Sequence, residues 1–111
     1  MSPKKENRSY PRAKTSISLT YQGKDSEQVL ETVTSDISAT GLSFMIHEEV
    51  PAGTIITLTL ILKETKRNVE AKATIIRTWK EGDDLFASVQ FMDIDYHDFI
   101  LLLDYSLAFQ I

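Results

Sequence analysis

The sequence predicts an all-β domain with a polar arm at its start and a single helix at its end. Short apolar segments alternate with polar residues in period two, turn residues recur between them, and no helical segment separates the predicted strands. Consecutive strands joined by short turns favour an antiparallel barrel or sandwich. The chain of 111 residues, 42% of them hydrophobic, is long enough for one such domain.

The first 14 residues form the predicted arm. They are polar and show no apolar period, so we expect a segment that is mobile without a partner, ahead of a folded body over residues 15–111. The arm holds five basic residues against Glu6 alone, a net charge of +4, while the whole chain carries −4 and the body therefore −8. An acidic body disfavours binding to a nucleic-acid polymer, whereas the arm can still hold a small anion.

Six strands are predicted in the body. The first shows strict alternation, with Leu19 and Tyr21 on its inner face, and the fourth and fifth are rich in β-branched residues. Clusters of Gly, Pro, Asp and Ser mark the turns, and Lys63–Arg67 is predicted as a polar hairpin loop. The predicted strands cover residues 17–22, 27–37, 42–47, 54–62, 68–78 and 85–91.

A helix is predicted from Tyr96 to about Leu107. Asp95 is its expected N-cap, and Asp98 lies in the first turn, where a carboxylate opposes the positive end of the helix dipole. The apolar residues of this segment cover more than one stripe, so one face can close the end of the domain while another stays exposed. The exposed face predicts either a simple cap with exposed leucines or a surface for a homodimer or an effector protein.

Arg8 and Arg12 stand four positions apart in the arm, with Pro11 fixing the backbone between them. In an extended chain the two residues lie up to ~13 Å apart. Each planar guanidinium matches two phosphate oxygens, or the O6 and N7 acceptors of guanine. We therefore expect the two arginines to capture an anion, although this spacing alone is also common in solvated basic tails.

Asp36, Ser38 and Gly41 lie between the second and third predicted strands. If Asp36 and Ser38 both belong to a strand, alternation places a carboxylate and a hydroxyl on the same face. The carboxylate can accept from the N–H edge of a nucleobase, and Gly41 permits a positive φ and a close backbone approach. The same residue types are also usual in a purely structural turn.

Together, the two motifs resemble those of the PilZ family, which are Arg-x-x-x-Arg near the N-terminus and Asp/Asn-x-Ser-x-x-Gly further along. Arg8, Arg12, Asp36, Ser38 and Gly41 fill every motif position, and the resemblance covers nearly the whole chain. It implies a six-stranded antiparallel PilZ-type β-barrel with a mobile N-terminal arm and one C-terminal helix. It also implies binding of cyclic di-GMP, a bacterial second messenger with two guanines and two phosphates, and no further cofactor.

The resemblance also implies a role for each motif residue. Arg8 and Arg12 are expected to wrap over the messenger from the arm and to bind guanine edges and phosphates. Asp36 and Ser38 are expected to fix the identity of the base, and Gly41 is expected to shape the turn.

Arg77 and Trp79 are two further candidates, on the fifth predicted strand. Alternation places them on the same face, where either side chain can lie against a guanine through cation–π or stacking contact. A bulge would reverse that face, and a tryptophan is commonly a core residue. We include Arg77 among the predicted ligand residues.

Catalytic, metal-binding and membrane roles have little support in the sequence. His47 and His97 lack carboxylate or cysteine partners at metal-ligand spacing, and the chain has no cysteine, so we expect neither an enzyme nor a metal site. The longest apolar run, Phe99–Leu103, is five residues, against the ~20 needed to cross a bilayer. The start of the chain lacks the apolar run of a secretory signal, so we expect a cytoplasmic protein without membrane insertion.

The functional hypothesis is a receptor in which the messenger orders the arm and alters a surface that an unidentified protein partner contacts. The alternative is a PilZ-like adaptor that works through protein contacts alone, as in motility, pilus or flagellar control. A third hypothesis, an oligonucleotide-binding barrel, calls for aromatic and basic residues interleaved on the strand surface. The acidic body and its single tryptophan disfavour that third hypothesis.

Overall fold

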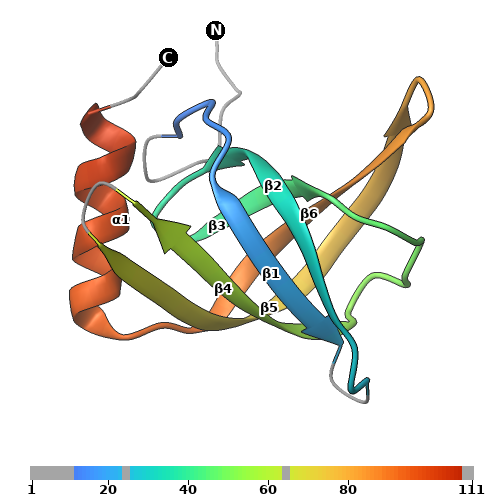
Figure 1. Ribbon diagram of the computed structural model, residues 1–111, viewed down its shortest axis with the longest axis horizontal. Helices are drawn as coiled ribbons and strands as arrows, with labels where there is room; N and C mark the ends of the chain where they lie inside the picture. The colour runs from blue at the N-terminus through green and yellow to red at the C-terminus, as the bar shows by residue number, and fades with distance from the viewer. Residues whose placement is uncertain (1–11, 24–25, 64–65, 109–111) are drawn as a thin grey trace, which may run out of the picture.

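A computed structural model of the chain describes residues 12–23, 26–63 and 66–108. Figure 1 shows that they form six strands followed by one helix, in the order predicted from the sequence. The elements are β1 (Ser18–Gly23), β2 (Val29–Ile37), β3 (Gly41–Met45), β4 (Ile55–Leu62), β5 (Arg67–Glu81), β6 (Asp84–Asp93) and α1 (Tyr96–Ala108).

The six strands close into a barrel with the neighbour order β1-β2-β3-β6-β5-β4. All neighbouring pairs are antiparallel, and β1 completes the barrel by pairing with both β2 and β4. The predicted all-β fold is confirmed, and of the two sheet arrangements that the residue pattern left open, the barrel is the correct one. β5 runs to Glu81, further than predicted, so its outer end projects with β6 as a hairpin beyond the barrel (Figure 1).

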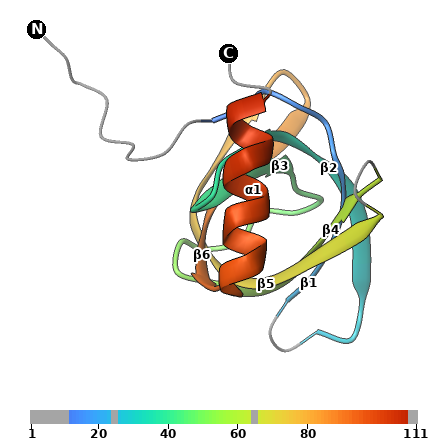
Figure 2. The ribbon, with the colours of Figure 1, turned by 90° about the vertical axis from the view of Figure 1, so that its left-hand side faces the viewer.

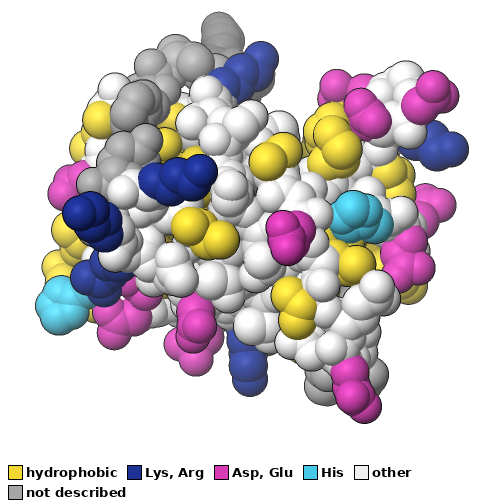
Figure 3. Space-filling view, in the orientation of Figure 1, with side chains coloured by type: hydrophobic (Ala, Val, Ile, Leu, Met, Phe, Trp, Pro, Cys, Tyr) yellow, Lys and Arg dark blue, Asp and Glu magenta, His cyan; other side chains and the backbone are white. Residues whose placement is uncertain are grey.

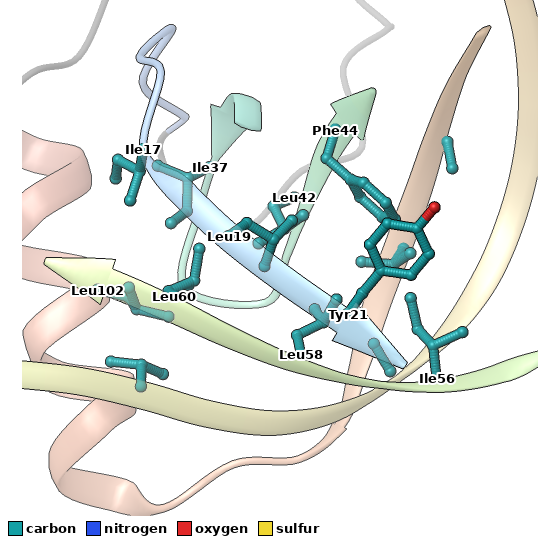
Figure 4. Close-up of a cluster of buried hydrophobic side chains, with 14 of the residues drawn as sticks. Ile17, Leu19, Tyr21, Ile37, Leu42, Phe44, Ile56, Leu58, Leu60 and Leu102 are labelled. Carbon is teal, nitrogen blue, oxygen red and sulfur yellow. The ribbon is translucent and has the colours of Figure 1, made fainter. Parts of the chain in front are cut away.

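Alternate side chains of the strands point inward and fill the barrel, as Figure 4 shows for the labelled residues of β1, β2, β3 and β4. Leu19 is 1% exposed, and Tyr21 from the same strand packs its ring against Phe44 at a centroid distance of 5.1 Å. The period-two pattern predicted for β1 is therefore confirmed. Leu102 of α1 is fully buried and closes this core from the helix side.

The helix α1 lies across one end of the barrel, as Figure 2 shows from the helix side. Asp95 is its N-cap as predicted, since its Oδ2 accepts a hydrogen bond of 2.9 Å from the His97 N–H. Tyr96 and Leu107 are 70% and 54% exposed, so part of the apolar surplus does face solvent. In the described part of the chain, no helix is both long and apolar enough to cross a membrane.

An ion pair ties the start of β5 to the first turn of α1. Both Nε and Nη2 of Arg67 donate to Asp98 Oδ1, at 3.1 and 2.7 Å. Asp98 is largely buried, so these two hydrogen bonds satisfy a carboxylate that would otherwise be destabilising there. The contact fixes the helix on the barrel end, and therefore also fixes the residues near the end of β2 that the helix covers.

The buried phenol of Tyr21 makes stability sensitive to alkaline pH. Burial raises the pKa of Tyr21 above its ordinary value, the hydrogen bond from the His47 N–H partly offsets this, and Glu48 adds to the rise. Above about pH 10 the unfolded chain loses this proton before the folded one does, which favours unfolding. We expect the free energy of unfolding to fall between about pH 9 and about pH 11, and less so in Tyr21→Phe.

Urea denaturation at several pH values measures this effect. Tyr96→Phe is the matched control, because Tyr96 is 70% exposed and its replacement should leave the pH dependence unchanged. An identical slope in the wild type and in Tyr21→Phe would show that the Tyr21 phenol contributes nothing to it.

Candidate functional site

The last residues of the predicted arm are held against the barrel. Ala13 is fully buried and pairs with Ile37, with a hydrogen bond of 2.9 Å from each N–H to the carbonyl oxygen of the other residue. We expected the folded body to begin at residue 15, whereas this pairing already involves Ala13. Arg8 and the predicted mobility of the arm lie outside the described residues.

The pairing of Ala13 places Arg12 beside Asp36, near the end of β2. Arg12 Nη1 donates to Asp36 Oδ1 at 2.6 Å, and the two side chains are 18% and 28% exposed. Arg12 Nε is buried and has no hydrogen-bond acceptor among the described residues. A buried N–H without an acceptor lowers stability by about 1–3 kcal/mol. A ligand that supplies an acceptor to this guanidinium is therefore favoured.

Ser38 lies in a turn, which is one of the two placements that the sequence left open. β2 ends at Ile37, so Ser38 belongs to the following turn and not to the face that carries Asp36. Its hydroxyl donates to the Gly41 carbonyl oxygen at 3.1 Å and accepts from the N–H groups of Thr40 and Gly41, each at 3.3 Å. The residue is 2% exposed, and the hydroxyl therefore holds the turn together.

Gly41 is required for a reason other than the predicted positive φ. Among the described residues the glycines with positive φ are Gly53 and Gly82, so that prediction for Gly41 is wrong. The predicted close approach is correct, and the neighbouring backbone is that of β6. A Cβ built on Gly41 would overlap the Val89 carbonyl oxygen and would lie 3.3 Å from Gln90 Cα.

Four polar residues form a row across the outer face of the barrel. Asp36 on β2 pairs with Ser43 on β3, Ser43 pairs with Ser88 on β6, and Ser88 pairs with Arg77 on β5. Directly paired residues project from the same face of a sheet, and three strand spacings separate the ends of the row by about 14 Å. Ser43 and Ser88 could not be recognised from the sequence, because only the strand register brings them between Asp36 and Arg77.

Arg77 and Trp79 occupy the far end of this row, and the prediction that they share a face is confirmed. The Arg77 guanidinium carbon lies 4.2 Å from the centroid of the Trp79 ring. The ring also stacks on Phe86 at 5.9 Å, and its Nε1 donates to Glu81 Oε2 at 2.8 Å. A bulge between Ile75 and Arg77 shifts the pairing with β6, yet both side chains still lie together.

Both histidines lie away from this row. His47 stacks on Tyr21 and its Nε2 lies 2.8 Å from the Glu31 carbonyl oxygen, while His97 Nδ1 lies 3.7 Å from Asp95 Oδ2. No three His, Asp or Glu residues of the described ranges gather closely enough to hold a metal ion.

Charge is unevenly distributed over the molecular surface. Figure 3 shows acidic side chains gathered over the outer end of the β5–β6 hairpin, where Glu81, Asp83 and Asp84 are all exposed. An anion approaching the barrel is repelled by this end of the hairpin. Of the two ends of the polar row, the one with Arg12 is the more remote from these carboxylates.

Comparison with solved structures shows proteins of the same fold. The chain resembles the Bacillus subtilis inhibitor of motility MotI/DgrA, with a TM-score of 0.84 and 20% identity over 97% of this chain and 56% of that one. It also resembles the PilZ domain, with c-di-GMP, of YcgR from Escherichia coli, with a TM-score of 0.70 and 14% identity over 94% of this chain and 92% of that one. MrkH of K. pneumonia in its apo state has a TM-score of 0.73 and 13% identity, over 98% of this chain and 53% of that one.

The chain therefore spans little more than half of the MotI/DgrA chain that it matches. A search of curated proteins gave no match. The family model described as PilZ domain matches residues 6–108. Together with the barrel order and the terminal helix, this match shows that the chain belongs to the PilZ domain family.

Proposed function

We propose that this PilZ domain is a non-catalytic receptor for cyclic di-GMP. The observation that carries the proposal is the pairing of Arg12 with Asp36, in which one buried N–H of the guanidinium has no acceptor among the described residues. Phosphate oxygens and the O6 and N7 atoms of guanine are acceptors that a guanidinium binds well. The fold similarity to a PilZ domain with c-di-GMP supports the same choice of ligand.

At the end of the row where Asp36 lies, the messenger replaces the contact between Arg12 and Asp36 and binds to both side chains. Arg12, together with Arg8 from the arm, takes phosphates and guanine acceptors, and Asp36 accepts from the N–H edge of a guanine. Ser38 and Gly41 act mainly through the turn that follows β2, because the Ser38 hydroxyl is buried and hydrogen-bonded within that turn. The five motif residues thus contribute to one binding site shared between arm and barrel.

At the far end of the row, Arg77 contacts a guanine. The Arg77 guanidinium lies over Trp79 and is exposed, so a planar base can stack on it or on the ring edge. Ser43 and Ser88, which lie between the two ends of the row, both have short side chains. The length of the row, about 14 Å, suits a ligand with two separated bases.

The output of the receptor is a changed protein surface. Binding orders the arm, and the arm is joined through Ala13 and Ile37 to α1, since Ser106 Oγ donates to the Ile37 carbonyl oxygen at 3.4 Å. We propose that an unidentified cytoplasmic effector protein, or a second copy of the chain through the exposed residues of α1, contacts this surface. In the alternative adaptor hypothesis, the protein partner binds the domain without any change caused by cyclic di-GMP.

Isothermal titration calorimetry tests the proposal. At ~10 μM protein we expect cyclic di-GMP to give a saturable heat, and cyclic di-AMP to give none. Adenine presents an acceptor where guanine presents the N–H that Asp36 needs, so the carboxylate rejects it. The absence of heat with cyclic di-GMP would favour the adaptor hypothesis. Equal heats with both nucleotides would mean that the site binds the phosphates without recognising the base.

A further inference from the structure

The segment that joins the arm to β1 is attached to β2 at two points. At one point Ala13 and Ile37 exchange backbone hydrogen bonds of 2.9 Å. At the other, the Thr34 N–H donates to the Ile17 carbonyl oxygen at 3.0 Å. The two points lie on either side of Asp36 in the sequence of β2, so they determine how the chain that carries Arg12 passes this carboxylate.

The Thr34 side chain makes the second attachment stronger. Its Oγ1 accepts from the Ile17 N–H at 2.9 Å and donates to the Thr15 carbonyl oxygen at 2.6 Å. The residue is 1% exposed, and a threonine hydroxyl has one proton to donate and lone pairs to accept with, so both bonds form at once. Thr34 therefore holds Thr15 and Ile17 together against the barrel.

The backbone of β2 does not provide the bonds that the Thr34 hydroxyl makes to Thr15 and Ile17. The register between β2 and β3 shifts between Thr34 and Asp36, which marks a bulge, and regular pairing of β2 with β1 begins only at Ser18 and Val33. Beyond the end of the β1–β2 ladder, a side chain can substitute for a missing backbone partner. The Thr34 hydroxyl provides that substitute for the residues that precede β1.

We propose that Thr34 is a positioning residue for Arg12, and this inference rests on the proposed function. Thr15 is three residues from Arg12, so a chain held at Thr15 confines Arg12 to within about 10 Å. With Ala13 also paired, Arg12 faces Asp36 before any ligand arrives. A site organised in advance loses less conformational freedom on binding, and this raises its affinity.

Thr34→Val is the direct test, because it keeps the shape of the side chain and removes both hydroxyl bonds. We expect a rise of about tenfold in the Kd for cyclic di-GMP, while Thr34→Ser, which keeps the hydroxyl, stays within about threefold of the wild type. Thr32→Val is the matched control, since Thr32 lies on the same strand and its Oγ1 donates to the Met45 carbonyl oxygen at 2.5 Å, on the β3 side.

A second readout needs no ligand. Trypsin cleaves after lysine, and Lys14 is exposed. The paired backbone of Ala13 and the hydrogen bond at Thr15 restrain the segment that must enter the protease. We expect cleavage between Lys14 and Thr15 to be several times faster in Thr34→Val than in the wild type. Thr34→Ser and Thr32→Val should be cleaved at the wild-type rate.

The outcomes separate the two proposals. If the wild type fails to bind cyclic di-GMP, the proposed function fails, and the trypsin rates still decide whether Thr34 restrains the arm. If the wild type binds and Thr34→Val binds equally well, or if Thr32→Val weakens binding as much, the positioning role is overturned. Should Thr34→Val not fold, Thr34→Ser and Thr34→Ala, which differ by the hydroxyl alone, give the same comparison.

Discussion

Replacing Arg12 with alanine should weaken binding of cyclic di-GMP by about a hundredfold or more. The guanidinium is expected to form at least two charge-assisted hydrogen bonds with the messenger, each contributing about 1.5–3 kcal/mol, and each 1.4 kcal/mol corresponds to about a factor of ten. Part of this gain is offset in the wild type, because Arg12 must first leave Asp36. Titration calorimetry on the purified variant measures the change.

Lys14→Ala is the matched control for this variant. Lys14 is exposed and lies two residues from Arg12, so its replacement removes the same charge from the same segment. We expect a loss of less than about threefold, since an exposed charge is screened by salt. Equal losses of affinity in the two variants would mean that Arg12 contributes to binding only through its positive charge. Arg12→Lys should not restore binding, because an ammonium lacks the planar fork.

Replacing Gly41 with alanine should lower the free energy of unfolding by about 3 kcal/mol or more. The added methyl group would overlap the Val89 carbonyl oxygen and would press on Gln90 Cα at 3.3 Å. Both neighbours are backbone atoms of β6, paired with β3 in the barrel, so neither can move without disrupting the ladder. Urea denaturation of the variant and the wild type measures the difference.

Gly23→Ala serves as the control for Gly41→Ala. Gly23 ends β1, its φ is not positive, and a Cβ built on it meets the Ser26 Cβ at 3.6 Å, an ordinary contact distance. We expect a change in stability within about 1 kcal/mol. An equally small loss of stability in Gly41→Ala would contradict this prediction, because it would mean that the backbone of β6 can shift despite its pairing with β3 and β5.

The strands could be predicted from the sequence because each has one buried face. In β1 the alternation that buries Leu19 and Tyr21 is visible in the residues themselves. The outer end of β5 was missed because Lys80 and Glu81 bury nothing and are held there by pairing with β6 alone. An apolar pattern indicates which residues are buried, and it does not predict the part of a strand that extends past the core.

The candidate site could be predicted only in part. Arg12 and Asp36 could be singled out because their residue types and spacing carry chemical information, and the structure brings the two side chains together. Their role in binding stays a prediction. For Ser38 the sequence left a strand and a turn both open, because the last residue of a strand is not visible in a pattern that a turn can also produce. The structure has Ser38 in the turn after β2. Ser88 and Thr34 could not be singled out, since their positions relative to the site follow from strand register and from hydrogen bonds between segments far apart in the sequence.

The projecting β5–β6 hairpin has a consequence for how the protein can be observed. Trp79 is the single tryptophan of the chain and lies on this hairpin, beyond the point where β4 pairs with β5. Segments with few neighbours open locally at a lower free energy than the core. The intrinsic fluorescence of the protein therefore reports on the hairpin and on what lies against it, and an early spectral change in urea would reflect opening of the hairpin before the barrel itself unfolds.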